Sequence, residues 1–186
     1  SPEIIRLVDA NIRKYALPAV VDPVMIAKGG ASLLRQEAVA ALRNELLPLA
    51  YLITPNLPEA EVLTGLTIRT ESDMEKAAAR LCDMGPRNVL VKGGHLEGDS
   101  VDLLVEGGRL HRFHEKRFDT PHTHGTGCTY SAAIATFLAQ GIPLVQAVER
   151  GKTFITEAIR LAPGIGHGHG PVNHFRAALN ALKLSL

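Results

Sequence analysis

The sequence predicts an α/β fold in which a mainly parallel sheet lies between two layers of helices. Three short apolar runs, at residues 19–21, 51–53 and 89–91, are continuous rather than alternating. Such runs are typical of parallel strands that are covered on both faces. The polar residues that follow the three runs are separated by 32 and then 38 residues, and both spacings fit βαβ units.

Two segments, one before the first apolar run and one between the first and second runs, have helical patterns. Residues 2–15 place apolar side chains on one helical face, and Pro2 suits the first turn of a helix. Residues 36–47 repeat apolar residues at positions i, i+3 and i+7, starting from Val39. We therefore expect one helix before the first strand and one between the first and second strands.

Local capping residues define the next two helices. A short helix is expected over residues 58–63, closed by Gly65. Thr70 is followed three residues later by Asp73, which indicates a helix N-cap. That helix is expected to continue to about Met84.

The C-terminal half begins with a predicted hairpin and ends in helices. Strands at 101–105 and 110–118, joined through a Gly-Gly pair, indicate an antiparallel addition at one edge of the sheet. Three helices are expected afterwards, over residues 125–140, 143–161 and 172–182.

Composition limits the classes of function. The 186 residues suit one domain, expected over residues 1–186, with 46% hydrophobic and 21% charged residues and a net charge of +1. This balance gives no electrostatic case for a nucleic-acid or anionic-membrane partner. The two cysteines give no disulfide framework, so a reducing cytoplasm is the expected setting. The eight histidines show no zinc-like spacing with cysteine.

The segment His-Gly-Thr-Gly-Cys-Thr at 124–129 carries the strongest chemical signal. It opens an Ala-rich, apolar helix, whose first backbone N–H groups are unpaired and attract anions. Cys128 would lie at the mouth of this anion site, and a helix N-terminus favours the thiolate. The alternative interpretation is a tight turn in which Cys128 is a small core residue.

Polar side chains also follow the predicted strands. Asp22, Asn56 and Lys92 each lie at the C-terminal end of an apolar run, the edge at which open α/β sheets bind ligands. Together with the helix start, they indicate one cleft. Singly, Asp22 could cap a turn before Pro23, and Lys92 could be solvated.

Four segments in this order resemble one enzyme family. They are Val-Asp-Pro-Val-Met at 21–25, Thr-Pro-Asn-Leu-Pro-Glu-Ala-Glu at 54–61, Val-Lys-Gly-Gly-His at 91–95 and the segment 124–129. They resemble hydroxymethylpyrimidine/phosphomethylpyrimidine kinases of thiamine biosynthesis, in the ribokinase-like superfamily. The resemblance implies a ribokinase-like three-layer α/β/α sandwich. It also implies that the chain corresponds to the C-terminal two-thirds of the enzyme, without the N-terminal strands that carry most pyrimidine contacts.

The resemblance also implies residue roles. Cys128 would be the catalytic base, within an anion hole formed by Gly125, Thr126, Gly127 and Cys128. Asp22 and Glu59 would serve a magnesium ion, with Glu59 in an Asn-x-x-Glu motif; the alternative for Glu59 is a surface charge that begins a helix. The ATP side would be formed by Asn56, Lys92, Gly93 and Gly94.

The implied activity is an ATP- and Mg²⁺-dependent phosphotransferase acting on 4-amino-5-hydroxymethyl-2-methylpyrimidine and then on its monophosphate. The full-length protein would be a homo-oligomer, expected to be a dimer. Two alternatives stay open: a pyridoxal kinase of the same superfamily, and a non-catalytic fragment that keeps only nucleotide affinity.

Overall fold

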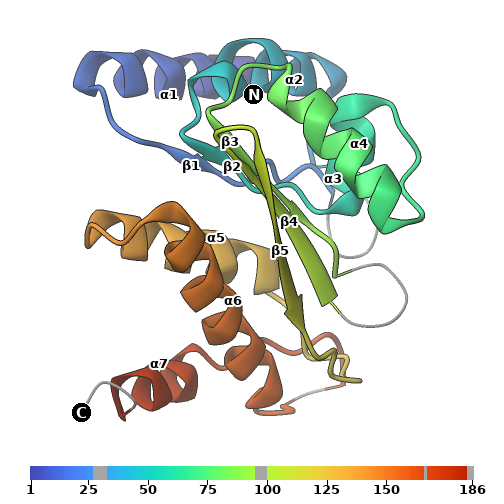
Figure 1. Ribbon diagram of the computed structural model, residues 1–186, viewed down its shortest axis with the longest axis vertical. Coiled ribbons are helices and arrows are strands. Elements are labelled where there is room, and N and C mark those ends of the chain that lie inside the picture. The colour runs from blue at the N-terminus through green and yellow to red at the C-terminus, as the bar shows by residue number, and fades with distance from the viewer. Residues whose placement is uncertain (27–32, 95–99, 166, 184–186) are drawn as a thin grey trace. The chain divides into compact units, whose positions relative to one another are not determined.

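The computed structural model describes residues 1–26, 33–94, 100–165 and 167–183 (Figure 1). The elements follow the predicted order. They are α1 (Pro2–Tyr15), β1 (Val20–Val21), α2 (Gln36–Ala41), the π-helical turn η1 (Leu42–Leu46), the 3₁₀ turn η2 (Leu47–Leu49), β2 (Leu52–Ile53), α3 (Leu57–Thr64), α4 (Glu71–Cys82), β3 (Asn88–Lys92), β4 (Ser100–Glu106), β5 (Arg109–Glu115), α5 (Thr126–Ala139), α6 (Leu144–Arg160) and α7 (His174–Lys183).

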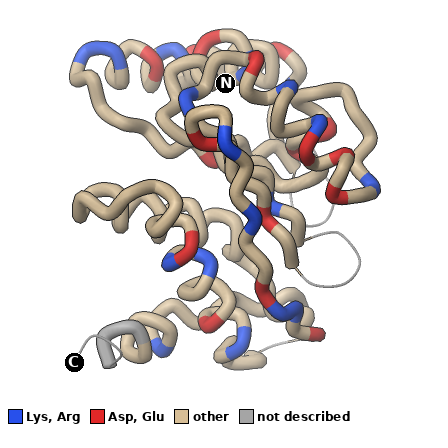
Figure 2. The backbone as a smooth tube through the Cα atoms, viewed as in Figure 1, with Lys and Arg blue, Asp and Glu red and all other residues tan. Residues whose placement is uncertain are grey.

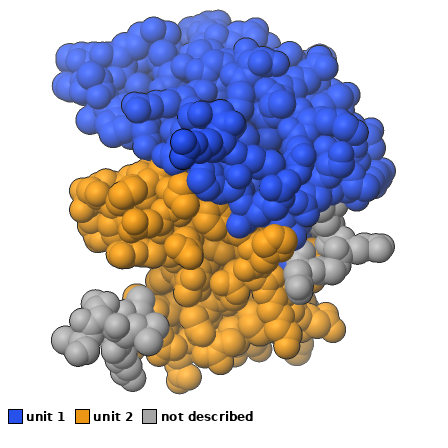
Figure 3. Space-filling model, in the orientation of Figure 1, with its two compact units in different colours: residues 1–112 blue, residues 113–186 orange. Residues whose placement is uncertain are grey.

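The chain divides into two compact units, residues 1–112 and 113–186 (Figure 3). The first contains α1 to α4 and most of the sheet, and the second contains α5 to α7. The single domain expected over residues 1–186 stays a prediction.

Within the described residues, five strands form one sheet in the order β1-β2-β3-β4-β5. β1 and β2 are parallel, as are β2 and β3, where Ile53 pairs with Val89. β4 runs antiparallel to β3, with Lys92 opposite Asp102. The parallel arrangement of the three apolar runs and the edge hairpin are thus confirmed. Because the hairpin reverses direction, the sheet as a whole is mixed.

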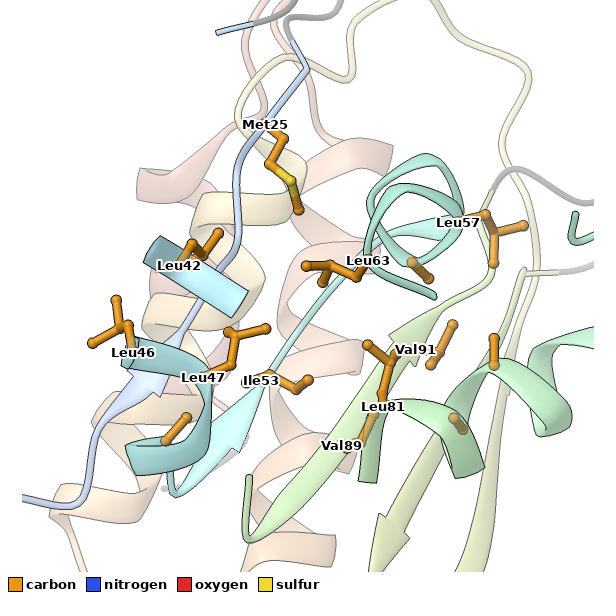
Figure 4. Close-up of a cluster of buried hydrophobic side chains, with 14 of the residues drawn as sticks. Met25, Leu42, Leu46, Leu47, Ile53, Leu57, Leu63, Leu81, Val89 and Val91 are labelled. Carbon is orange, nitrogen blue, oxygen red and sulfur yellow. The ribbon is translucent and has the colours of Figure 1, made fainter. Parts of the chain in front are cut away.

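The core of the first unit lies between the sheet and its helices (Figure 4). Ile53 on β2 packs in one cluster with Leu63 of α3 and Leu81 of α4, and all three are fully buried. Leu52 and Leu90, outside this cluster, are fully buried as well. Burial of both faces explains why the strand sequences are continuously apolar.

Most helix boundaries match the predictions, with one change of helix type. Thr70 and Asp73 form the expected reciprocal capping box at the start of α4. The helix predicted over 36–47 starts as α2 but becomes a π turn and then a 3₁₀ turn. Pro48 lies in that last turn, and proline cannot donate the next α-helical hydrogen bond. Strand β5 ends at Glu115 rather than at residue 118.

The second unit is built on the close packing of α5 against α6. A Cβ atom on Gly151 of α6 would lie 2.9 Å from Cγ1 of Ile134 on α5. Only glycine allows that approach. The N–H of Asn173, just before α7, donates to the carbonyl of Ala158 on α6 at 2.8 Å.

Charges of both signs are interspersed along the helices, as Figure 2 shows for α1 and α6. None of the described helices combines the length and apolarity that crossing a membrane requires.

Candidate active site

The C-terminal ends of β1, β2 and β3 bring together a buried charged group in the first unit. The Lys92 ammonium donates to Oδ1 of Asp22 at 2.8 Å. The Thr54 hydroxyl donates to the same oxygen at 3.0 Å. Only 11% of the Lys92 side chain and 15% of the Asp22 side chain are exposed. Lys92 is therefore a buried partner of Asp22 and not a solvated surface lysine.

Sequence reasoning did not identify Thr54 as a member of this group. Thr54 is fully buried directly after β2, and its hydroxyl orients the Asp22 carboxylate. Its position in the sequence could have indicated this role, because a polar residue at the end of a buried strand needs a hydrogen-bond partner.

Asn56 and Glu59 form a capping box at the start of α3. The Glu59 N–H donates to Oδ1 of Asn56, and the Asn56 N–H donates to Oε2 of Glu59, each at 2.9 Å. Glu59 is 2% exposed, so its interpretation as a surface charge is wrong. Asn56 also pairs with Lys92 through an isolated β-bridge, which connects the capping box to the charged group.

The electrostatics of Glu59 reflect this burial. Burial raises the pKa of the Glu59 carboxyl above its ordinary value, and the negative charge of Asp22 raises it further. Hydrogen bonds from the backbone of Asn56 and Met25, and the positive charge of Lys92, oppose that rise. Glu59, Asp22 and Lys92 are therefore close enough to interact electrostatically.

The donor set of this group suits magnesium. Mg²⁺ in phosphate-binding sites takes one or two carboxylates and completes its shell with phosphate oxygens and water. Asp22 and Glu59 supply two neighbouring carboxylates, and a cation between them would relieve their repulsion. In the part of the chain that the structure describes, no three or more His, Cys, Asp or Glu side chains group as a metal cage.

Gly93 and Gly94 follow Lys92 at the end of β3. The Gly93 N–H donates to Oδ1 of Asp102 at 2.9 Å. A Cβ atom on Gly93 would lie 2.0 Å from the carbonyl oxygen of Val101, so no larger residue fits there. Gly94 is exposed, and His95, the last residue of this motif, lies outside the described residues.

The glycine-rich segment opens α5 in the second unit. Gly125 is the N-cap and has a left-handed backbone, with φ of 85°. The Thr126 hydroxyl donates to the carbonyl of Thr123 at 2.7 Å, which fixes the turn. Gly127 and Cys128 are in the first helical turn, and Cys128 is exposed. The exposed thiol makes the core-residue interpretation of Cys128 wrong.

The histidine-rich loop is joined to the segment before α5. His124 pairs with Pro171 in an isolated β-bridge, and its N–H donates to the Gly170 carbonyl at 3.0 Å. The Gly170 N–H donates to Nδ1 of His122 at 3.2 Å. A pocket of about 310 Å³ lies in this region, lined by Pro121, His122, His167, Gly168 and His169.

The predicted residues thus fall into two groups. Asp22, Asn56, Glu59 and Lys92 lie together in the first unit, as expected from the strand ends. The anion-hole residues lie in the second unit. That both groups serve one cleft stays a prediction.

Comparisons with known proteins identify the family. The chain matches the family model of phosphomethylpyrimidine kinase over residues 1–173. It is 48% identical over 186 residues to hydroxymethylpyrimidine/phosphomethylpyrimidine kinase from Bacillus subtilis (strain 168), which covers 98% of this chain and 69% of the relative. It is 56% identical over 180 residues to the thiamine biosynthesis bifunctional protein ThiED from Geobacter sulfurreducens, which covers 96% of this chain and 37% of the relative. The chain therefore spans only part of the length of these relatives.

Solved structures of related kinases have the same fold. Bacillus subtilis pyridoxal kinase, in an ADP complex, superposes with a TM-score of 0.86 at 36% identity, covering 99% of this chain and 67% of that one. Phosphomethylpyrimidine kinase from Clostridium difficile 630 gives a TM-score of 0.74 at 44% identity, covering 86% of this chain and 65% of that one. The chain therefore belongs to the phosphomethylpyrimidine kinase family and has its α/β, ribokinase-like fold.

Proposed function

We propose that the full-length protein transfers a phosphoryl group from ATP to the hydroxymethyl group of 4-amino-5-hydroxymethyl-2-methylpyrimidine. It then phosphorylates the monophosphate to the diphosphate, in thiamine biosynthesis. The observation that carries the proposal is the start of α5, where left-handed Gly125 precedes an exposed Cys128. The names of the relatives from Bacillus subtilis and Geobacter sulfurreducens agree with it.

The start of α5 suits the transferring phosphoryl group. The N–H groups of the first turn have no carbonyl partner within the helix, and the helix dipole adds partial positive charge. The Thr126 N–H makes a long hydrogen bond, of 3.4 Å, to the Thr123 carbonyl before the helix, which an anion would have to replace. Gly125, Thr126, Gly127 and Cys128 would therefore stabilise the negative charge that spreads over the equatorial oxygens. Because these donors belong to the backbone, the anion hole does not depend on the Cys128 side chain.

Cys128 acts as the base in the first phosphorylation. The substrate hydroxyl oxygen forms a bond to the γ-phosphorus while its proton passes to the Cys128 thiolate. The bond from the γ-phosphorus to its bridging oxygen breaks, and ADP leaves with that electron pair. In the second phosphorylation the attacking oxygen belongs to a phosphate that is already ionised, so a base contributes less.

The charged group at the strand ends of the first unit binds ATP. Lys92 carries the positive charge that phosphate oxygens require, and Asn56 with the Gly93 and Gly94 turn forms the adjoining backbone. Asp22 and Glu59 would hold magnesium, which neutralises phosphate charge when bound. Burial, and to a smaller extent the negative charge of Asp22, raises the pKa of Glu59, and a cation bound beside it would favour its ionised form.

We further propose that the protein works in the cytoplasm on small molecules, as a homo-oligomer, and that the oligomer is a dimer. A net charge of +1, with charges of both signs interspersed along α1 and α6, gives no electrostatic case for nucleic acid or an anionic membrane. Sedimentation of the full-length protein measures the oligomeric state directly.

A substrate panel tests the proposed function. Full-length protein is incubated with ATP and Mg²⁺ and with the hydroxymethylpyrimidine, its monophosphate or pyridoxal, and ADP release is measured. We expect turnover on both pyrimidines, with a higher kcat/KM than on pyridoxal. A preference for pyridoxal would identify a pyridoxal kinase. Nucleotide binding without turnover would identify a non-catalytic protein.

Variants of the two cysteines test the assigned base. Cys128→Ala should reduce kcat on the hydroxymethylpyrimidine by about 10²–10⁴-fold, the usual effect of losing a general base. Its ATP affinity should stay unchanged, because the anion hole is made of backbone groups. Cys82→Ala is the matched control, since Cys82 is half-buried in α4. Near-normal turnover of Cys128→Ala would assign the base to another group.

A further inference from the structure

Asp102 is a buried carboxylate to which neither the sequence motifs nor the proposed chemistry gives a role. It lies in β4 directly opposite Lys92 of β3 and is 2% exposed. Its Oδ1 accepts the Gly93 N–H at 2.9 Å. Gly93 is the first residue beyond β3, so a side chain, rather than a strand carbonyl, holds this backbone donor.

Burying a carboxylate at this position lowers the stability of the protein unless the carboxylate makes an interaction that an apolar residue cannot make. Removing an ionised group from water costs several kcal/mol before its partners compensate it. A hydrogen bond to a charged acceptor is roughly twice as strong as one between neutral groups. Asp102 therefore gives the Gly93 N–H a stronger anchor than a backbone carbonyl would give.

Gly93 also packs closely against the backbone of the neighbouring strand β4. A Cβ atom there would meet the Val101 carbonyl oxygen at 2.0 Å and the Met74 side chain at 2.8 Å. Asp102 accepts the Gly93 N–H, and the Val101 carbonyl leaves no room for a Cβ atom, so the backbone position of Gly93 is fixed from β4. The position of Gly93 in turn sets the direction of the Gly93–Gly94 turn.

The same anchor fixes the end of β3, where Lys92 reaches Asp22. The Lys92 N–H donates to the Pro55 carbonyl at 2.9 Å on the β2 side. Asp102 holds the next residue from the β4 side. The backbone of Lys92 is thus held between two strands, which directs its ammonium group to Asp22.

We propose that Asp102 is a positioning residue for nucleotide binding, acting through Gly93 on the Gly93–Gly94 turn and on Lys92. The inference rests on the proposed function, because that function assigns the turn and Lys92 to the ATP side. Asp102 itself touches no reacting atom. Its required feature is an acceptor oxygen at Oδ1, and the negative charge strengthens the hydrogen bond that this oxygen accepts.

Three variants of the full-length protein separate positioning from stability. Asp102→Asn keeps an acceptor oxygen of the same reach. Asp102→Leu has a similar size but leaves the Gly93 N–H without that acceptor. Val105→Ala is the matched control, because Val105 lies on the same strand, opposite Val89, and is remote from the turn. Affinity for a non-hydrolysable ATP analogue, KM for ATP and for the pyrimidine, and melting temperature are measured for each.

We expect Asp102→Leu to weaken the affinity for the ATP analogue about 10-fold or more, the effect of losing a hydrogen bond to a charged group. The pyrimidine KM should change little. Asp102→Asn should restore nucleotide affinity to within about threefold of wild type. Val105→Ala should lower the melting temperature without changing nucleotide affinity. If Asp102→Leu does not fold, Asp102→Ser, whose hydroxyl is too short to reach Gly93, takes its place.

Two results would overturn the inference. One is a lower melting temperature in Asp102→Leu with unchanged nucleotide affinity, which would make Asp102 purely structural. The other is an Asp102→Asn variant as weak as Asp102→Leu, which would make the charge the essential feature. Failure of the proposed function is a separate result, because it appears as wild-type protein that binds the analogue but phosphorylates no substrate.

Discussion

Replacing Gly93 by alanine should destabilise the first unit by an amount that can be worked from the structure. The new Cβ atom would lie 2.0 Å from the Val101 carbonyl oxygen, and real Cβ atoms essentially never approach closer than 3.0 Å. Strand β4 therefore has to move by about 1 Å, since a backbone carbonyl cannot rotate out of the way. A movement of that size stretches the Gly93–Asp102 hydrogen bond well beyond its present 2.9 Å and breaks it.

The steric clash with Val101 and the loss of the hydrogen bond to Asp102 both lower the free energy of unfolding. Overpacking costs about 1–3 kcal/mol, and losing a hydrogen bond to a charged group costs about 1.5–3 kcal/mol. We expect Gly93→Ala to be less stable by about 2.5–6 kcal/mol in total. Since 1 kcal/mol shifts the melting temperature of a domain of this size by about 2–4 °C, the melting temperature should fall by roughly 5–24 °C.

Gly94→Ala is the matched control, one residue further along the chain. Among the described residues, its Cβ atom would have only the Ser100 hydroxyl nearby, at 3.8 Å, which is an ordinary contact. We expect a change within about 0.5 kcal/mol. Urea denaturation followed by circular dichroism measures both variants in the full-length protein. A Gly93→Ala variant as stable as Gly94→Ala would refute the close approach of β3 and β4 and the role given to Asp102.

Three further predictions concern the charge, the base and the histidine loop. Glu59→Gln should be at least as stable as wild type, and its turnover should be lower and depend less on magnesium. The stability difference in urea should be absent below about pH 4.5, the ordinary pKa of the carboxyl. It should grow as the pH rises from there towards the raised pKa of the folded protein, because in that range the carboxyl is ionised only in the unfolded chain, and it should level off above the raised pKa. A difference independent of pH would contradict the burial argument. Cys128→Asp should recover part of the turnover that Cys128→Ala loses, since a carboxylate can also accept the proton, and equal rates for the two variants would contradict a base role. Gly170→Ala should lower the melting temperature, because its Cβ atom would lie 2.3 Å from Nδ1 of His122. Gly168→Ala is the control, because no atom of the described residues would lie within 4 Å of its Cβ atom. Equal melting temperatures would contradict the packing of the loop.

Local chemistry explains why much of the fold could be predicted from the sequence. The Thr70–Asp73 capping box and the closure of α3 by Gly65 depend on neighbouring residues only, and both are present. The parallel order of the three apolar runs followed from their spacing and from burial on both faces. The helix over 36–47 was predicted as uniform, because periodicity does not distinguish an α-helix from the π and 3₁₀ turns next to Pro48.

The sequence by itself determined the order of the elements, the helix caps, the family, and which polar residues stand at the strand ends. Only the tertiary structure decided which of these residues meet. Lys92 and Asp22 are 70 positions apart in the chain, and the Thr54 hydroxyl and the Asp102 carboxylate join the group only through the sheet register. The burial of Glu59 was likewise undecided, because an acidic residue in a first helical turn has the same local pattern whether it is exposed or buried. Burial and long-range pairing depend on how strands align with one another, and no local pattern in the chain encodes that alignment.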